Sequence, residues 1–365
     1  MRTQLPALAL LGAIALLPSS ASAASGSAVP SAKPMFVTLP NHGTLAPRAP
    51  AAQLVQWSGS FTDLTNKHIT YVMVGTNPTS TNVATTIPVM IIPIKMVYGS
   101  TNGNTTFDPN THTVSNGKTV VQNTIASPLF VSGIDFVQGG TDLGTTQYVD
   151  AFQRGNYWSS VSTNSSYHVL LGTPTVLTEQ TINVSRAQGK VMKNPFGAGN
   201  VGTMTINAFD TQLQGFIRKL TQINPGVLPI FLTYDIYLTQ GGCCIGGYHS
   251  ANGAQPSGQT YSYSTYVDVP GSFAQDVSAL SHEIAEWLDD PFVNNRVNCT
   301  DNSILEVGDP LEGETNYGGY PYALNGFTYN LQSLVFLGYF GAPRTTSVNS
   351  WLSFQNDETH VCPGQ

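Results

Sequence analysis

Residues 272–291 constrain the fold of this chain most, because their pattern predicts a single amphipathic helix. Ser272 is suited to the N-cap position, and Gln275 three residues later completes a capping box. Pro291 ends the run, because the residue before a proline is disfavoured in a helix. Apolar side chains recur at helical spacing and make one face of this helix, formed by Phe273, Val277, Leu280, Ile284 and Trp287.

Another face of the predicted helix carries the motif H-E-x-x-E, which begins at His282. Because His282 and Glu286 are four residues apart, they lie one turn from each other and could bind the same metal ion. Glu283 could act as a general base, as in H-E-x-x-H metallopeptidases. The alternative is an ordinary charged face in contact with water. The chain has seven glutamates, five of them between positions 283 and 314, and this grouping favours the metal site.

A catalytic zinc ion takes three protein ligands and keeps one position for water, so a third ligand is needed. Glu306, twenty residues after Glu286, is the first choice. Asp309 is the runner-up, or a partner that accepts a hydrogen bond from His282 and orients it. Carboxylate ligands lower the selectivity for zinc, so another divalent metal is the alternative cofactor.

These residues predict a metal-dependent peptidase acting on a peptide or protein substrate that the sequence does not identify. In this mechanism a metal-activated water attacks the peptide carbonyl, and Glu283 takes its proton and passes it to the leaving amine. The oxyanion needs a further donor. His249 and Tyr248, in the glycine-rich segment 241–249, are candidates, with a structural role as the alternative.

Two other classes of function compete with the peptidase. The first is a non-catalytic extracellular or cell-surface protein that keeps a structural metal site, so catalytic activity stays open. The second is a glycoside hydrolase that pairs Glu283 with Glu306 or Asp309. The glycosidase ranks lower because it gives His282 no role.

Residues 1–23 have the form of a secretory signal peptide, with Arg2 before a short apolar run and Ala-Ser-Ala at positions 21–23. We therefore expect a secreted, extracellular protein, with the periplasm as the alternative location. No later segment is long and apolar enough to predict an integral membrane helix. Charged residues make up 10% of the chain and the formal net charge is −7 without basic clusters, which excludes nucleic acid as an expected partner. The oligomeric state stays open.

The four cysteines suggest disulfides in an exported chain. Adjacent cysteines rarely bond to each other because the ring that they close is strained. On that ground Cys243 and Cys244 would each pair with Cys299 or Cys362. The alternative is a local Cys243–Cys244 bridge together with a Cys299–Cys362 bridge.

The motif and the residues around it resemble the plant exordium (phosphate-induced protein) family and its bacterial relatives, over roughly residues 227–315. In that family a similar H-E-x-A-E helix is followed by N-P-L-V-N and E-I-A-D, which correspond here to residues 290–294 and 306–309. The family also has a pair of cysteines just before a Gly-x-His, here ending at His249. This chain departs from the family because its two loop cysteines are adjacent and Leu311 stands where relatives tend to have a cysteine. The resemblance implies a zincin-like site, an extracellular setting and, if the family pair bonds locally, a Cys243–Cys244 bridge.

We expect an α+β fold with a β-rich N-terminal half followed by a zincin-like catalytic half built around the H-E-x-x-E helix. Residues 24–55 read as a flexible Ala/Pro/Ser-rich leader, a spacer or a removed pro-segment. A β-rich region follows over 56–200 and a metal-site region over 201–365, and the alternative is one compact domain over 56–365. Within these regions the pattern predicts strands at 69–74, 87–97, 227–238 and 261–269, a hairpin or meander over 168–184, and helices at 146–154 and 210–220. Pro88 and Pro93 favour a sheet edge or a bulge.

Overall fold

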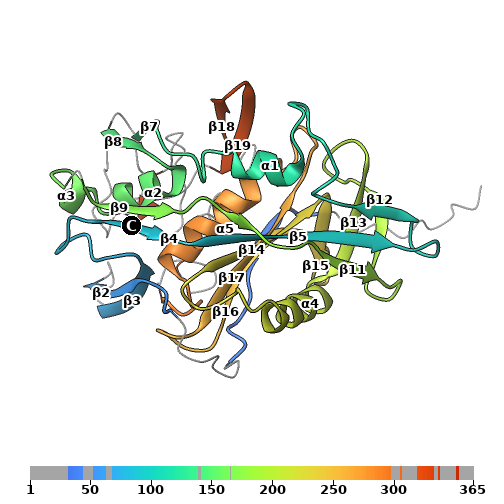
Figure 1. Cartoon of the computed structure of the whole chain (residues 1–365), viewed down its shortest axis with the longest axis horizontal. Helices are drawn as coiled ribbons and strands as arrows, with labels where there is room; N and C mark the ends of the chain where they lie inside the picture. Colours follow the sequence, from blue (N-terminus) through green and yellow to red (C-terminus); the bar gives the residue numbers. More distant parts are fainter. Residues whose placement is uncertain are drawn as a thin grey trace, which may run out of the picture. The chain divides into compact units, whose positions relative to one another are not determined.

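The computed structural model of the chain (Figure 1) describes residues 32–43, 52–62, 68–138, 141–164, 166–296, 305, 319–332, 336–337 and 351–352. Strands take 42% of these residues and helices 17%. The predicted signal peptide lies outside the described residues, and so does the predicted leader except for residues 32–43 and 52–55.

Eleven strands form one mixed sheet that curls into a nearly closed barrel. Eight of them are neighbours in the order β10, β5, β14, β17, β16, β15, β13, β12, while β1 adds to β16, and β6 and β11 add to β5. In chain order they are β1 Met35–Thr38, β5 Val89–Tyr98, β6 Thr105–Phe107, β10 Thr175–Val176, β11 Gln180–Val184, β12 Gly189–Lys193, β13 Asn200–Thr205, β14 Leu228–Tyr234, β15 Ile236–Thr239, β16 Cys243–Asn252 and β17 Gln259–Tyr266.

This sheet shows that the predicted fold class is wrong. A β-rich first half and a separate zincin-like second half would keep their strands apart, whereas β5 pairs in parallel with β14 from Val89 beside Leu228 onward. Both strands are almost continuously apolar and buried, as is typical of parallel strands whose sheet is covered on both faces. The two halves of the sequence therefore meet at the middle of one sheet, and the described residues do not form a separate zincin-like half.

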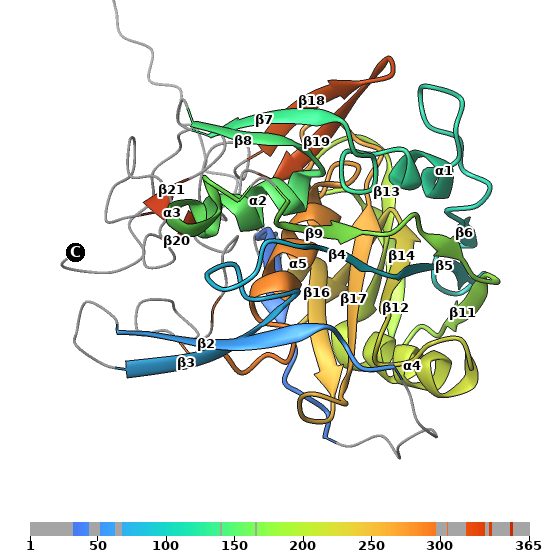
Figure 2. The same ribbon diagram turned by 60° about the vertical axis from the view of Figure 1, so that its left-hand side comes forward.

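Two helices cover opposite faces of the sheet, α5 Ser278–Asp289 and α4 Ile206–Lys219 (Figure 2). Successive side chains of β17 point to opposite faces of the sheet, one toward α5 and the next toward α4. Trp287 of α5 donates its indole N–H to Thr260 Oγ1 over 2.9 Å, whereas Tyr261 packs in the same apolar cluster as α4. The apolar stripe of α5 lies in the larger cluster, with side chains from β5 and β14. The remaining helices are α1 Val120–Ile125, α2 Tyr148–Asn156 and α3 Trp158–Val161.

Five two-stranded sheets complete the described part of the chain. Two of them lie against α5, because both β3 and β19 contact that helix. The pairs are β2 Gln56–Thr62 with β3 His68–Val74, β4 Ala84–Ile87 with β9 His168–Leu171, β7 Ile134–Gln138 with β8 Thr141–Thr146, β18 Gly319–Leu324 with β19 Phe327–Gln332, and β20 Phe336–Leu337 with β21 Trp351–Leu352.

Several local predictions are wrong for identifiable reasons. Pro88 and Pro93 predict that the strand at 87–97 lies at a sheet edge or contains a bulge. In the structure β5 lies inside the sheet, and Pro93 pairs with Leu232. Its missing N–H is tolerated because Pro93 falls at the break between β10, which pairs with residues 90–91, and β11, which pairs with residues 94–98. The hairpin or meander expected over 168–184 does not form, since β9 pairs with β4 and β11 with β5, both in parallel.

The predicted capping box at the start of α5 is also wrong. The helix begins at Ser278, and no side chain caps it. Ser272 Oγ instead shares a hydrogen bond with Tyr237 Oη over 2.7 Å, and Gln275 Oε1 accepts from Gly271 N over 2.8 Å. Asp276 has a φ of 43°, and this left-handed residue separates the turn from the helix.

The Asp276 side chain predicts how stability varies with pH. Burial raises its pKa to about 7 from 3.8, although it accepts hydrogen bonds from Asn330. The folded chain therefore holds a proton on Asp276 that the unfolded chain loses between about pH 4 and 7. The contribution of this group to stability is fully present below this window and falls as pH rises through it, by on the order of 1 kcal/mol per pH unit. Asp276→Asn should flatten this dependence in urea unfolding at several pH values. Parallel curves for the two proteins would contradict it.

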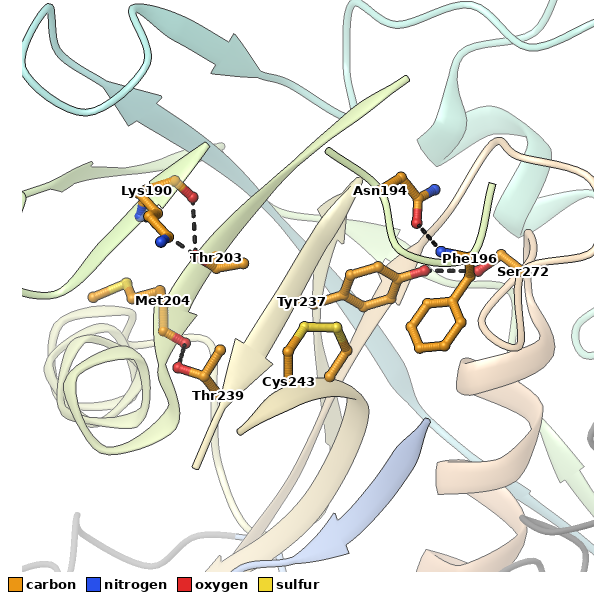
Figure 3. Close-up of a disulfide and its surroundings, with 10 residues drawn as sticks. Lys190, Asn194, Phe196, Thr203, Met204, Tyr237, Thr239, Cys243 and Ser272 are labelled. Atoms are coloured by element: carbon orange, nitrogen blue, oxygen red, sulfur yellow. Dashed lines mark hydrogen bonds between the residues drawn. A yellow bond between two sulfur atoms is a disulfide. The ribbon is translucent and has the colours of Figure 1, made fainter. Parts of the chain in front are cut away.

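The described residues contain one disulfide, which joins Cys243 to Cys244 at the start of β16 (Figure 3). The pairing of each of these cysteines with Cys299 or Cys362 is therefore wrong, and those two residues lie outside the described ranges. The Tyr237 ring and its hydrogen bond to Ser272 lie beside the bridge (Figure 3). Among the helices that the structure describes, none is long and apolar enough to cross a membrane.

Candidate metal centre

Four ionisable side chains meet in the interior between α5 and β16. His282, Glu283 and Glu286 come from the helix, and His249 comes from the strand. Their exposed fractions are 1% for Glu286 and 0% for the other three. This burial excludes the alternative of a charged helix face in contact with water, because carboxylates are kept out of water only where a partner charge or ion compensates them.

His249 reaches the cluster because side chains alternate between the two faces of β16. Gly247 and His249 face α5, while Tyr248 between them faces the other side and donates its hydroxyl hydrogen to Asp210 Oδ1 of α4 over 2.9 Å. The sequence predicts a loop here because glycines usually mark turns. In the strand, Gly247 instead leaves room for the Glu283 side chain, which would touch a Cβ at that position.

The hydrogen bond of His249 sets which of its nitrogens faces the carboxylates. Nε2 lies 3.2 Å from the carbonyl oxygen of Asp290, which can only accept, so Nε2 carries a hydrogen. Nδ1 then faces Glu283 Oε2 at 3.5 Å and Glu286 Oε2 at 3.6 Å. In a neutral ring Nδ1 carries a lone pair, and a lone pair beside two carboxylates is favourable only with a proton or a cation between them.

His282 shows the same arrangement on the other side of Glu286. Its Nδ1 is hydrogen-bonded to Gln332 Oε1 of β19, and its Nε2 lies 2.9 Å from Glu286 Oε1. An amide oxygen accepts, so Nδ1 is the protonated nitrogen and Nε2 faces the glutamate. Glu286 therefore lies between two imidazoles, with one oxygen toward each.

The donor set fits a divalent metal ion. Ligand atoms of His249, Glu283 and Glu286 all lie within 4.8 Å of one another, and His282 Nε2 adjoins the same glutamate. Imidazole nitrogens and carboxylate oxygens are zinc ligands, and a hydrogen bond on the second nitrogen of each ring fixes it for that use. The alternative is a cluster of protonated histidines paired with glutamates, and this alternative requires no metal.

The described residues contain part of the predicted ligand set. The structure brings together His282 and Glu286 as the helical spacing predicts, with Glu283 beside them. Glu306 and Asp309 lie outside the described residues. His249, predicted as an oxyanion donor, has its Nδ1 3.6 Å from Glu286 Oε2, while Tyr248 points away to Asp210. A helix motif alone does not identify a ligand from a distant strand, since that requires knowledge of which strand packs on the helix.

Comparisons with known proteins give no match for this chain: no family model fits it, and no curated protein and no solved structure is significantly similar.

Gly247→Ala tests whether the close approach of β16 and α5 matters to the centre. A Cβ at position 247 would lie 2.6 Å from Glu283 Oε1 and 2.7 Å from its Cγ, so the carboxylate must move. Glu283 Oε2 lies 3.5 Å from His249 Nδ1, so a displaced carboxylate would disturb that imidazole even though Glu283 itself need not bind the metal. We expect metal affinity to fall by about 10–100-fold, measured by competition with a chromophoric chelator. Gly215→Ala on α4 is the matched control, because its Cβ would meet no heavy atom within 4 Å. Equal affinities in both variants would contradict the prediction.

Proposed function

We propose that the protein is a secreted, zinc-dependent peptidase-like hydrolase whose metal ligands are His249, His282 and Glu286. The observation that carries the proposal is the position of Glu286, with one carboxylate oxygen 2.9 Å from His282 Nε2 and the other 3.6 Å from His249 Nδ1. Secretion, and the resemblance of roughly residues 227–315 to the exordium family, are parts of the proposal. Another divalent ion is the alternative to zinc.

The side chains support distinct tasks in hydrolysis. When bound, zinc would supply a Lewis acid that polarises a carbonyl and acidifies water. Glu283 is the proton acceptor, because its carboxylate adjoins the ligands in the space that Gly247 leaves for it. Gln332 and the Asp290 carbonyl orient the two imidazoles through their second nitrogens. The closed surroundings keep bulk water out, which strengthens each of these interactions.

The proposal is tested by metal analysis of the intact protein. We expect about one equivalent of a divalent ion per chain, its removal by chelator, and its return on reloading with zinc. Reloading at a hundred times the dissociation constant should stabilise the fold by about 2.7 kcal/mol, seen as a higher melting temperature. A protein that takes up no divalent ion and whose melting temperature does not respond to zinc has the protonated ion-pair cluster, and the proposal is then wrong.

A further inference from the structure

The candidate centre is closed to a substrate in this structure, since His249, His282 and Glu283 are all 0% exposed. Part of its cover comes from the N-terminal segment. The ring of Phe36 stacks on the ring of His282 with centroids 4.0 Å apart and planes at 24°. A peptide can therefore reach the centre only by displacing residues that cover it. Phe36 is one of these residues, and it is in direct contact with a proposed metal ligand.

Residues 33–42 follow the edge of β16 over its whole length. Lys33 N donates to Cys243 O over 2.8 Å at one end, and His42 N donates to Ala251 O over 3.0 Å at the other. Between them β1 pairs in parallel with β16, with Phe36 beside Gly247. The other partners of β16 are β17, which pairs with residues 247–252, and β15, which pairs with Cys243 and Ile245 at the start of the strand. The segment thus adds one strand at the edge that passes the candidate centre.

The contacts of this segment are those of an extended peptide bound by strand addition. Its backbone supplies most of the hydrogen bonds, and only two of its side chains are buried, Phe36 at 4% and Leu39 at 7% exposed. Phe36 packs in a cluster with Phe273 and Cys244. Ser250 Oγ donates to the carbonyl oxygen of Leu39 over 3.0 Å. In strand addition the backbone gives affinity and the buried side chains give selectivity. Here Phe36 and Leu39 pack in different apolar clusters.

We propose that the β16 edge is the substrate-binding edge of the centre, and that residues 33–42 occupy it in place of substrate. The substrate class is an extended peptide with a large apolar side chain at the place of Phe36 and a second one three residues later, at the place of Leu39. This inference rests on the proposed function, because Phe36 lies at the candidate centre only through its contact with His282, a proposed metal ligand. It also gives the N-terminal segment a role, since the site opens only when the segment leaves.

The test uses the full chain with a specific protease site in place of residues 44–51. After cleavage and gel filtration, a fluorescent peptide of residues 32–43 is added and its anisotropy is measured. The cleaved protein should bind about one equivalent. The uncleaved protein should bind at least about 100-fold more weakly, because its own segment competes at a millimolar effective concentration. A peptide with Phe36→Ala should bind at least about 10-fold more weakly, while Lys33→Ala, an exposed side chain, should match the parent peptide.

Each outcome decides the inference. Cleaved protein that unfolds by circular dichroism, that keeps its fragment against excess labelled peptide, or that stays folded and binds no peptide would overturn it. Binding is measured with and without chelator, because strand pairing needs no metal. Peptide uptake by a protein without zinc would support the binding edge while the metal proposal fails, and zinc binding without peptide uptake would overturn the inference alone.

Discussion

Replacing Glu283 by glutamine is expected to remove peptidase activity and leave the metal in place. Glutamine keeps the size of the side chain but cannot accept a proton, so turnover should fall by about 10²–10⁴-fold. Its buried position beside Gly247 leaves little space for a substitute base. The measurements are steady-state peptide hydrolysis after removal of the N-terminal segment, and metal content by mass spectrometry.

The matched control for this variant is Glu179→Gln. Glu179 forms an ion pair with Lys95 at 3.0 Å, away from α5 and β16, so both activity and metal content should stay at the level of the original protein. Loss of the metal together with activity in Glu283→Gln would show that Glu283 is a ligand. The ligand set would then be His249, Glu283 and Glu286, the three whose atoms lie within 4.8 Å of one another.

His249→Ala is expected to weaken zinc binding by at least about 100-fold. Changes in groups that merely orient ligands cost about 10–100-fold in affinity, so loss of a ligand should reach at least the upper end. The same change at His112 is the control, because that ring bonds to Asp268 at 3.0 Å and stacks on Tyr234. Competition with a chromophoric chelator measures both variants. Unchanged zinc affinity in His249→Ala would limit the protein ligands to the helix and to residues beyond those described.

Local periodicity was enough to predict several elements. The strand predicted at 69–74 is β3, His68–Val74, and the helix predicted at 210–220 lies within α4 and one residue beyond it. The apolar stripe of the H-E-x-x-E helix faces the core as its spacing requires. These elements follow from side chains that are close in sequence, and a pattern of period 2 or 3.6 records them directly.

The pairing of the strands could not be predicted in the same way. The two glycines before Tyr248 look like turn residues, yet the segment is buried and extended because a helix lies against it. Pro93 looks like an edge signal, yet its missing donor falls at the break between two partner strands. In both cases the meaning of the residue depends on a neighbour far away in sequence. The position of His249 beside Glu286 has the same origin.

The parallel pairing of β5 with β14 also determines when the chain can fold. Val89 can pair only after Leu228 has been synthesised, and Phe36 of β1 only after Gly247. The central sheet therefore cannot close until most of the polypeptide has been made. Contacts of such long sequence separation slow folding, because a large loop must be closed before the pairing can stabilise it. During synthesis the apolar β5 strand would remain without its partner, in a state open to chaperones. Chains that end before β17 should therefore collect as unfolded, protease-sensitive species.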